Sequence, residues 1–325
     1  MGAPGQVCPY CNDGKSDVLY AGMHDRLGLY PRAFDVLVCR GCGTARVDEV
    51  PAASELAGLY PAEYIIKEDT AKGGLMGLWK RAERRLFYDR VYGMDVRNVV
   101  AAAGVSSGTA LDVGCGNGGR LGYLADAGLR PEGIETSAVD VEYITKNLGH
   151  KARLGTLTGL DFEEGAYSLI TFFNVFEHLP DPAESAMKAF RLLRPGGCIA
   201  ISGPVMDSVQ SRVFGSRWIE VAEMPRHIYI PTVRGLSELL GRSGFAGITV
   251  RPEITFKLAH TMAESIVPGA IGAAAYRKGR LSAMFTRAAG AAVMAMCMPL
   301  ALAERYSGSA CTRLVLARKP GGAGG

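Results

Sequence analysis

The chain lacks three features that would point to a nucleic acid, to secretion or to a membrane span. Its 36 basic and 32 acidic residues are interspersed, and the net charge of +4 with no basic run argues against a nucleic-acid partner. The N-terminus has no charged-then-apolar signal, and Gln6 stands where myristoylation needs Ser or Thr. The apolar run 288–303 is too short to span a bilayer. We therefore expect a cytoplasmic protein.

The most informative stretch is TALDVGCGNGG, residues 109–119. An apolar run ends at Asp112 and continues into a glycine-dense turn, after which RLGYLADAG has the pattern of a helix. Glycine allows positive φ and a close approach of the backbone to a ligand. The pattern predicts a strand-to-helix turn that holds a nucleotide-like cofactor in an α/β protein.

The glycine spacing by itself leaves the cofactor open. Gly114, Gly116 and Gly119 also satisfy G-x-G-x-x-G, the dinucleotide fingerprint. Glu135, in GIETS, would serve as the ribose-binding acid with either NAD or S-adenosylmethionine (SAM).

Two later segments resolve this ambiguity. YSLITFFNVFEHLPDP (167–182) reads as a buried strand that ends near Asn174, and FRLLRPGGCIAISGP (190–204) reads as a helix end, a turn and another strand. With LDVGCGNG and Glu135, this ordered set resembles the Rossmann-like, SAM-dependent methyltransferases over roughly residues 95–260. The resemblance implies a seven-stranded α/β sheet and SAM rather than NAD.

The resemblance also implies a set of cofactor contacts. Backbone at Gly114 and Gly116 would receive the methionyl end of SAM, Asp112 would supply negative charge near its ammonium, and Glu135 would accept both ribose hydroxyls. Asn174 would lie beside the methyl group. The other residues assigned to the cofactor are Cys115, which alternatively only packs there, and Gly118, Thr136, Thr156 and Leu157.

Four of the eight cysteines form two C-x-x-C pairs, Cys8 with Cys11 and Cys39 with Cys42. Two such pairs joined by a strand-rich stretch predict a zinc ribbon with four thiolate ligands and no open catalytic position. A redox dithiol would need only one pair, and disulfides fit poorly with a cytosolic chain.

Between this ribbon and the core, LYPAEY (59–64) precedes a helical pattern over 77–92. Similar methyltransferases with zinc ribbons carry a Tyr-Pro-x-x-Tyr motif here. Tyr60 and Tyr64 are therefore candidates to line the SAM or substrate pocket, and the alternative is that they join the ribbon to the core. The helix is interpreted as a lid or connector.

Two histidines are the candidate catalytic bases. His227 lies in a motif that the resemblance places in the active-site cleft, and His178 lies in FEHL. Histidine titrates near neutrality and can accept a proton during methyl transfer, although alignment dominates such a reaction. A structural role for either histidine stays open. Tyr229 and Glu223 are lesser candidates, and Glu177 is expected to orient a loop.

About 50 residues separate the last two expected strands, GFAGITVRPEITF and ACTRLVLARKP. They include the apolar run 288–303, flanked by Arg287 and Glu304. A buried helical hairpin that could mediate homodimerisation is the first interpretation. An interfacial patch that reaches a lipid-linked acceptor is the second.

We therefore expect a zinc-ribbon domain (1–58), a helical connector (59–94), a methyltransferase domain (95–320) with a helical insertion at about 257–309, and a disordered tail (321–325). The expected activity is C- or O-methylation of a hydroxylated small molecule such as a sugar, a sugar nucleotide or a natural-product scaffold. Methylation of a ribosomal RNA base is the alternative enzyme function, and an inactive SAM-binding scaffold is a remote one.

Overall fold

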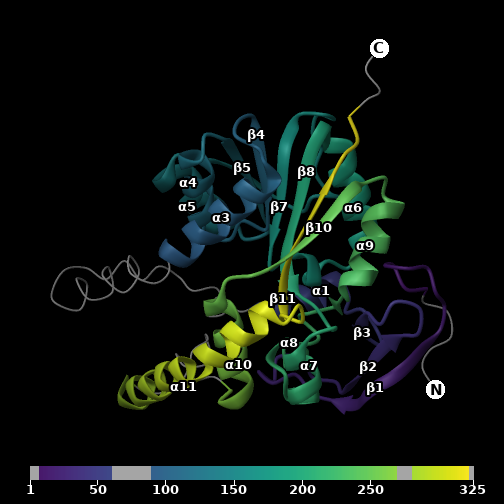
Figure 1. Cartoon of the computed structure of the whole chain (residues 1–325), viewed down its shortest axis with the longest axis vertical. Coiled ribbons are helices and arrows are strands. Elements are labelled where there is room, and N and C mark those ends of the chain that lie inside the picture. The colour runs from purple at the N-terminus through teal and green to yellow at the C-terminus, as the bar shows by residue number, and fades with distance from the viewer. Residues whose placement is uncertain (1–6, 61–88, 269–279, 322–325) are drawn as a thin grey trace.

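The computed structural model describes residues 7–60, 89–268 and 280–321, and Figure 1 gives its overall view. Its main sheet has seven strands in the order β10-β11-β8-β7-β4-β5-β6. The five central and edge strands from β8 to β6 run parallel, whereas β11 is antiparallel to both of its neighbours. The strands are β4 (Thr109–Val113), β5 (Arg130–Glu135), β6 (Lys151–Leu154), β7 (Tyr167–Phe173), β8 (Leu193–Pro204), β10 (Ala246–Pro252) and β11 (Thr312–Arg318).

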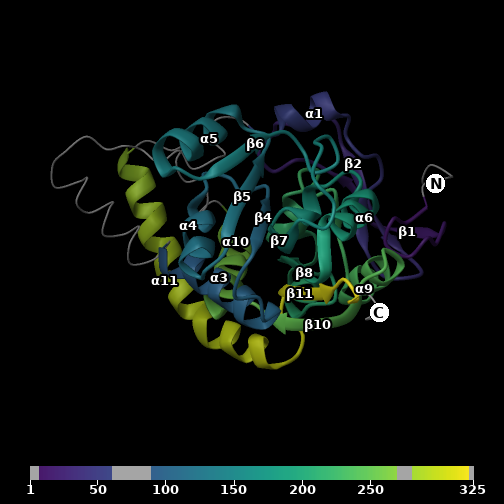
Figure 2. The ribbon, with the colours of Figure 1, turned by 90° about the horizontal axis from the view of Figure 1, so that it is seen from above.

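The central strands are apolar because helices cover both faces of the sheet. All seven residues of β7 are buried, which accounts for its nearly continuous apolar sequence YSLITFF. One face packs against α3 (Asp89–Ala103), α4 (Gly119–Asp126) and the π-helical turn η2 (Ile144–Leu148), which continues α5 (Ala138–Tyr143). The other face packs against α6 (Pro182–Leu192) and α9 (Val233–Arg242), as Figures 1 and 2 show. The expected α/β fold with a seven-stranded sheet is confirmed.

The predicted turn at LLRPGG is enclosed within β8. The strand begins at Leu193, and its pairing with β7 breaks register between Tyr167 and Leu169. Gly196 has a φ of 76°, so the backbone departs from regular strand geometry there before regular pairing with β7 resumes at Cys198.

The N-terminal segment forms three strands of a second sheet, and a fourth strand is added from much later in the chain. Its strands are β1 (Ser16–Met23), β2 (Phe34–Cys39) and β3 (Ala45–Val47), followed by the short helix α1 (Ala53–Gly58). A fourth strand, β9 (Tyr229–Ile230), comes from far along the chain, beyond β8, and pairs with β3. The ribbon sheet therefore includes residues from beyond the segment 1–58.

The expected insertion is a pair of helices between β10 and β11. Helix α10 (Thr255–Ile266) packs along α11 (Arg280–Tyr306), and both lie at the lower end of the molecule in Figure 1. Strand β10 ends at Pro252, so the last part of the segment expected as a strand instead opens α10. Two short helices, α7 (Val209–Phe214) and α8 (Ile219–Ala222), lie beside the pair. Within the described residues, no helix combines the length and the hydropathy that a membrane span requires.

Candidate active site

The strand order reverses between β4 and β7, and their carboxyl ends form the point where α/β sheets bind ligands. The glycine turn follows β4, Asn174 follows β7, and Glu135 ends β5. Residues from three separate motifs therefore meet at one edge of the sheet. The structure brings these predicted site residues together.

The three glycines of the turn have different structural roles. Gly114, Gly116 and Gly118 all have φ between 55° and 77°. A Cβ on Gly114 would lie 2.5 Å from the Val175 side chain, and one on Gly118 would lie 2.6 Å from Ile144, so both are required for packing. A Cβ on Gly116 would meet nothing within 4 Å. The backbone at Gly116 therefore faces open space, as a cofactor cradle requires.

Asp112 ends β4 with a buried and incompletely paired carboxyl group. Its Oδ1 accepts a 2.7 Å hydrogen bond from the Thr171 hydroxyl, and its Oδ2 has no hydrogen-bond partner. Burial raises the pKa of Asp112 to about 6, although Arg120 and Thr171 favour the charged form. An orphaned carboxylate oxygen beside the glycine turn fits the predicted role near the SAM ammonium.

Glu135 is held against the same turn. Its Oε2 accepts a 2.9 Å bond from the Gly116 N–H, and its Oε1 accepts bonds of 2.7 and 3.1 Å from the N–H groups of Thr136 and Ser137. The carboxylate is thus fixed next to the open face of Gly116. This position fits the predicted contact with ribose hydroxyls.

The other predicted cofactor residues differ in how exposed their side chains are. Thr156 is exposed after β6 and Leu157 is buried. Asn174 is exposed with φ of 55°, an uncommon conformation for a non-glycine residue that often marks functional sites. The Cys115 side chain is buried against Gly133, which agrees with packing. Tyr64 lies outside the described residues.

Sequence reasoning missed Arg120, the second residue of α4. Its guanidinium lies 4.4 Å from the ring centre of Tyr92 and 4.6 Å from that of Phe173, and it pairs with Asp95 at 3.7 Å. Its charge also acts on Asp112. A basic residue directly after the glycine turn was the available signal.

The two candidate histidines are neighbours. Their ring centres are 4.7 Å apart and the ring planes are inclined at 63°, with His178 partly buried and His227 buried. A hydrogen bond from the Ile228 N–H to the Glu177 carbonyl joins the two segments and brings the rings together. One oxygen of Glu177 and one nitrogen of each ring lie within 4.8 Å of one another, a spacing that would also suit a metal ion.

The Nδ1 atom of each imidazole lies within hydrogen-bond distance of a backbone carbonyl oxygen. His178 Nδ1 lies 2.9 Å from the Arg226 oxygen, and His227 Nδ1 lies 2.8 Å from the Glu220 oxygen. A carbonyl can only accept, so we assign the hydrogen to Nδ1 in both rings. Each Nε2 then keeps its lone pair and can accept a proton from a bound molecule.

The residues around the pair have clear partners. The Tyr60 hydroxyl lies 2.9 Å from His178 Nδ1, so this tyrosine reaches the predicted pocket. Glu223 pairs with Arg26 and Arg226, and the Tyr229 ring packs 5.8 Å from that of Tyr10. These contacts give Glu223 and Tyr229 structural roles.

Sequence reasoning also missed Glu220, which is close to the histidine pair. Its Oε2 lies 3.4 Å from His227 Nδ1, and burial raises its pKa to about 8. Burial lowers the pKa of His227 well below its usual range. Both side chains are therefore neutral near pH 7. Nothing in the local sequence of Glu220 marks it as part of the site.

The four cysteines of the ribbon fit a zinc ion. Their sulfurs all lie within 4.8 Å of one another, with 3.4 Å between Cys11 and Cys39 and 3.7 Å between Cys8 and Cys42. Four sulfurs around zinc at about 2.3 Å are about 3.8 Å apart. The turns are also alike, since Asn12 and Gly43, which follow the two pairs, both have positive φ.

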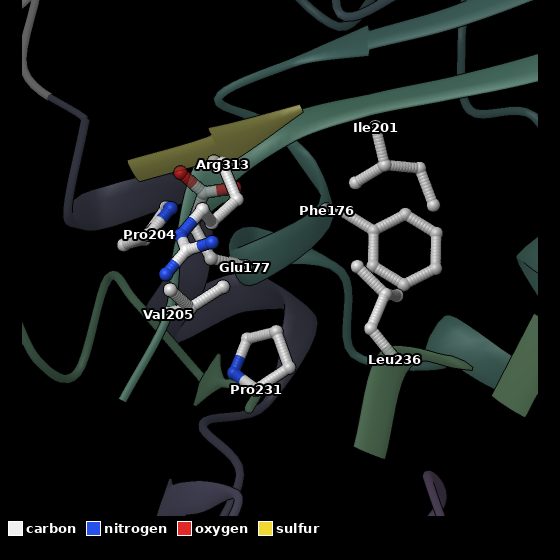
Figure 3. A pocket seen from close by; sticks show the side chains of 9 residues that line it. Phe176, Glu177, Ile201, Pro204, Val205, Pro231, Leu236 and Arg313 are labelled. Atoms are coloured by element: carbon white, nitrogen blue, oxygen red, sulfur yellow. The ribbon is translucent and has the colours of Figure 1, made fainter. Parts of the chain in front are cut away.

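A small, partly open pocket is lined by Glu177 and by residues outside the predicted site. Figure 3 shows Glu177 and Arg313 on one side and the apolar side chains of Phe176, Ile201 and Leu236 on the other. Neither Asp112 nor Glu135 nor either histidine lines it. This small pocket therefore does not define the cofactor or acceptor site.

Comparison with known proteins agrees with this geometry. The methyltransferase domain family matches residues 79–250, more than half of the chain. The chain belongs to this family, the Rossmann-like SAM-dependent methyltransferases.

Individual relatives are more distant. A probable S-adenosylmethionine-dependent methyltransferase of Mycolicibacterium smegmatis is 29% identical over 136 residues, 42% of this chain and 51% of that protein. A ubiquinone biosynthesis O-methyltransferase of Aromatoleum aromaticum is 30% identical over 106 residues, 31% of this chain and 45% of the relative. The chain spans about half the length of the relatives it matches.

A solved structure shares the fold. Haemonchus contortus phosphoethanolamine N-methyltransferase 2, in complex with S-adenosyl-L-methionine, aligns with a TM-score of 0.50 at 17% identity. The alignment covers 82% of this chain and 57% of that one.

Proposed function

We propose that this protein transfers a methyl group from SAM to a hydroxylated small molecule, by C- or O-methylation. The observation that carries the proposal is the pair His178 and His227, whose Nδ1 atoms rest on carbonyl oxygens and whose Nε2 atoms are left to accept a proton. The pair adjoins the loop after β7, next to the glycine turn. The O-methyltransferase named among the relatives supports a small-molecule acceptor.

Different residues of the chain would bind SAM and accept the proton. Backbone at Gly116, with the carboxylates of Asp112 and Glu135, would hold SAM, which supplies an electrophilic methyl group when bound. One histidine Nε2 would take the proton that the acceptor hydroxyl or carbon acid loses. Alignment supplies most of the acceleration in such a transfer, and the base adds a smaller part.

A structural zinc ion at Cys8, Cys11, Cys39 and Cys42 is part of this proposal, and so is a cytoplasmic location. Methylation of ribosomal RNA is the alternative, and it is less favoured because the charges of the chain are mixed and its net charge is only +4.

The test incubates the protein with methyl-labelled SAM and, separately, with sugar nucleotides, small phenols and ribosomal RNA. Label in one class of small molecule supports the proposal, and label only in RNA overturns it. Metal analysis of Cys39→Ser protein, in which the cysteine group is broken, tests whether the Glu177, His178 and His227 group binds a metal ion instead of acting as a base.

Three variants then test the histidines. His178→Gln and His227→Gln should each retain SAM binding by calorimetry, and the variant that removes the base should lose roughly 10²-fold or more in kcat. His24→Gln, at an exposed position in the ribbon, is the matched control. Unchanged turnover in both test variants would mean that neither histidine is the base.

A further inference from the structure

Helix α11 is apolar around its whole circumference over residues 289–303. Gly290, Cys297 and Ala301 are buried on the side that faces the protein. The opposite side, here called the outer face, consists of Ala292, Ala295, Met296, Pro299, Leu300, Leu302, Ala303 and Tyr306, all exposed. A surface helix usually carries polar residues on its exposed side. Met296 is 69% and Leu300 62% exposed, so this apolar surface has no cover within the described chain.

The one acidic residue near the end of the helix points away from this face. Glu304 is 4% exposed, and its carboxylate accepts hydrogen bonds from the Gln210 amide (2.7 Å) and the Cys311 N–H (2.8 Å). These bonds tie the end of α11 to α7 and to the start of β11. The helix is thus anchored with its apolar outer face turned outward.

The surrounding sequence has charge of one sign. Residues 267–303 contain four basic residues, Arg277, Lys278, Arg280 and Arg287, and no acidic residue. The net charge of the whole chain is +4, so the remaining residues are neutral in sum. In the sequence, two of the four basic residues stand shortly before α11, and the other two, Arg280 and Arg287, stand in its N-terminal half.

We propose that the outer face of α11 lies on an anionic lipid surface. A helix with an apolar face next to clustered basic residues is suited to the boundary between headgroups and acyl chains, where it lies in the plane rather than spanning. Each basic residue near an anionic leaflet strengthens binding roughly fivefold. This proposal does not depend on the identity of the reaction.

The helix pair is connected to the histidine pair through α8. Helix α10 contacts α8, where the Ile219 N–H donates a 2.9 Å hydrogen bond to the Ser265 hydroxyl. The next residue, Glu220, accepts from His227.

Charge favours a lipid surface over a second copy of the chain. A two-fold interface through α11 would bring together two copies of a helix that carries Arg280 and Arg287, and like charges on two copies cost free energy. An anionic bilayer meets the same helix with opposite charge. A dimer through this helix is therefore an outcome that would overturn the proposal.

The experiment is flotation of the full-length protein with vesicles of phosphatidylcholine alone or mixed with phosphatidylglycerol. The wild type should float with the mixed vesicles, much less with phosphatidylcholine alone, and less in high salt. Met296→Glu combined with Leu300→Glu should reduce bound protein at least tenfold. Met187→Glu, at a 45% exposed position of α6 on the sheet domain, is the matched control and should float like the wild type.

SAM calorimetry on each variant checks that the fold and the cofactor site are intact, and light scattering after gel filtration gives the oligomeric state. Absence of wild-type binding to mixed vesicles, or binding that the double variant leaves unchanged, overturns the proposal. A wild-type dimer that the double variant converts to a monomer would instead identify a second copy as the occupant.

Discussion

Asp112→Asn should stabilise the cofactor-free protein near neutral pH while it weakens SAM binding. The wild-type carboxyl group is buried, and one of its oxygens has no hydrogen-bond partner. Keeping it charged therefore costs free energy unless a cation compensates. The side-chain oxygen of the asparagine can still accept the hydrogen bond from Thr171. Because the asparagine is uncharged, the free energy of burying a charge no longer opposes folding.

The magnitude follows from the pKa of Asp112, which burial raises from 3.8 to about 6. A shift of about two units corresponds to about 3 kcal/mol of destabilisation once the group is ionised. Because the folded-state pKa is the higher one, this penalty is absent below the unfolded-state value, grows as the pH rises between 3.8 and about 6, and is constant above that window. The packing cost of the asparagine amide does not change with pH, so it cancels when two pH values are compared.

The assay is urea unfolding of wild type and variant near pH 4 and near pH 7.5. The stability of the variant relative to wild type should rise by up to about 3 kcal/mol between the two conditions. Its affinity for SAM should fall roughly tenfold near neutral pH, since a charge-assisted contact is lost. A difference in stability that stays constant with pH, or an unchanged affinity, would refute the reasoning.

Asp25→Asn is the control of opposite sign. Burial opposes ionisation of Asp25, but Arg226 and the N–H groups of Leu27, Leu29 and Tyr30 outweigh it and lower its pKa. The stability that this carboxylate contributes is therefore present at neutral pH and lost as the pH falls through its folded-state pKa. The variant should be less stable than wild type near neutrality, and the deficit should shrink in acid.

The remaining predictions concern the cofactor turn and the ribbon. Gly116→Ala and Gly149→Ala should each lower the free energy of unfolding by about 1 kcal/mol, because both positions have positive φ and open space around them. Only Gly116→Ala should weaken SAM binding in calorimetry. Equal affinities of the two variants for SAM would exclude Gly116 from the cofactor site. Glu135→Gln should raise the Kd for SAM about tenfold or more, and an unchanged Kd would contradict a ribose contact. Wild-type protein should contain about one zinc per chain by mass spectrometry of the metal, and Cys39→Ser should lose it; metal-free wild type would contradict the ribbon.

The sheet could be predicted because each of its signals is local. TALDVG followed by RLGYLADAG gives β4, the glycine turn and α4 within one short segment. The apolar run 167–173 has the length of a strand and is rich in aromatic and β-branched residues, which indicates a buried strand. The insertion before β11 was visible as a gap between two expected strands.

The contacts that set the chemistry depend on long-range pairing and could not be predicted. Thr171 and Asp112 meet only because β4 and β7 are adjacent and in register. Glu220 becomes relevant only because α8 lies against His227. Whether the apolar face of α11 is buried or interfacial was left open, since composition alone does not tell which side of an apolar helix the protein covers.

Strand β9 connects the ribbon sheet to the segment that carries His227, so the ribbon can affect the histidine pair. His227 lies two residues before Tyr229, whose strand is held by β3 of the ribbon sheet. Thr232, two residues after β9, donates a 2.6 Å hydrogen bond to the carbonyl of Cys42, one of the expected zinc ligands. Loss of the ribbon fold would therefore release the segment that orients His227, whereas Glu135 ends β5 of the seven-stranded sheet and Gly116 follows β4 of that sheet. In the proposed function, the ribbon would fix one wall of the acceptor site, and its loss should lower kcat more than it weakens SAM binding.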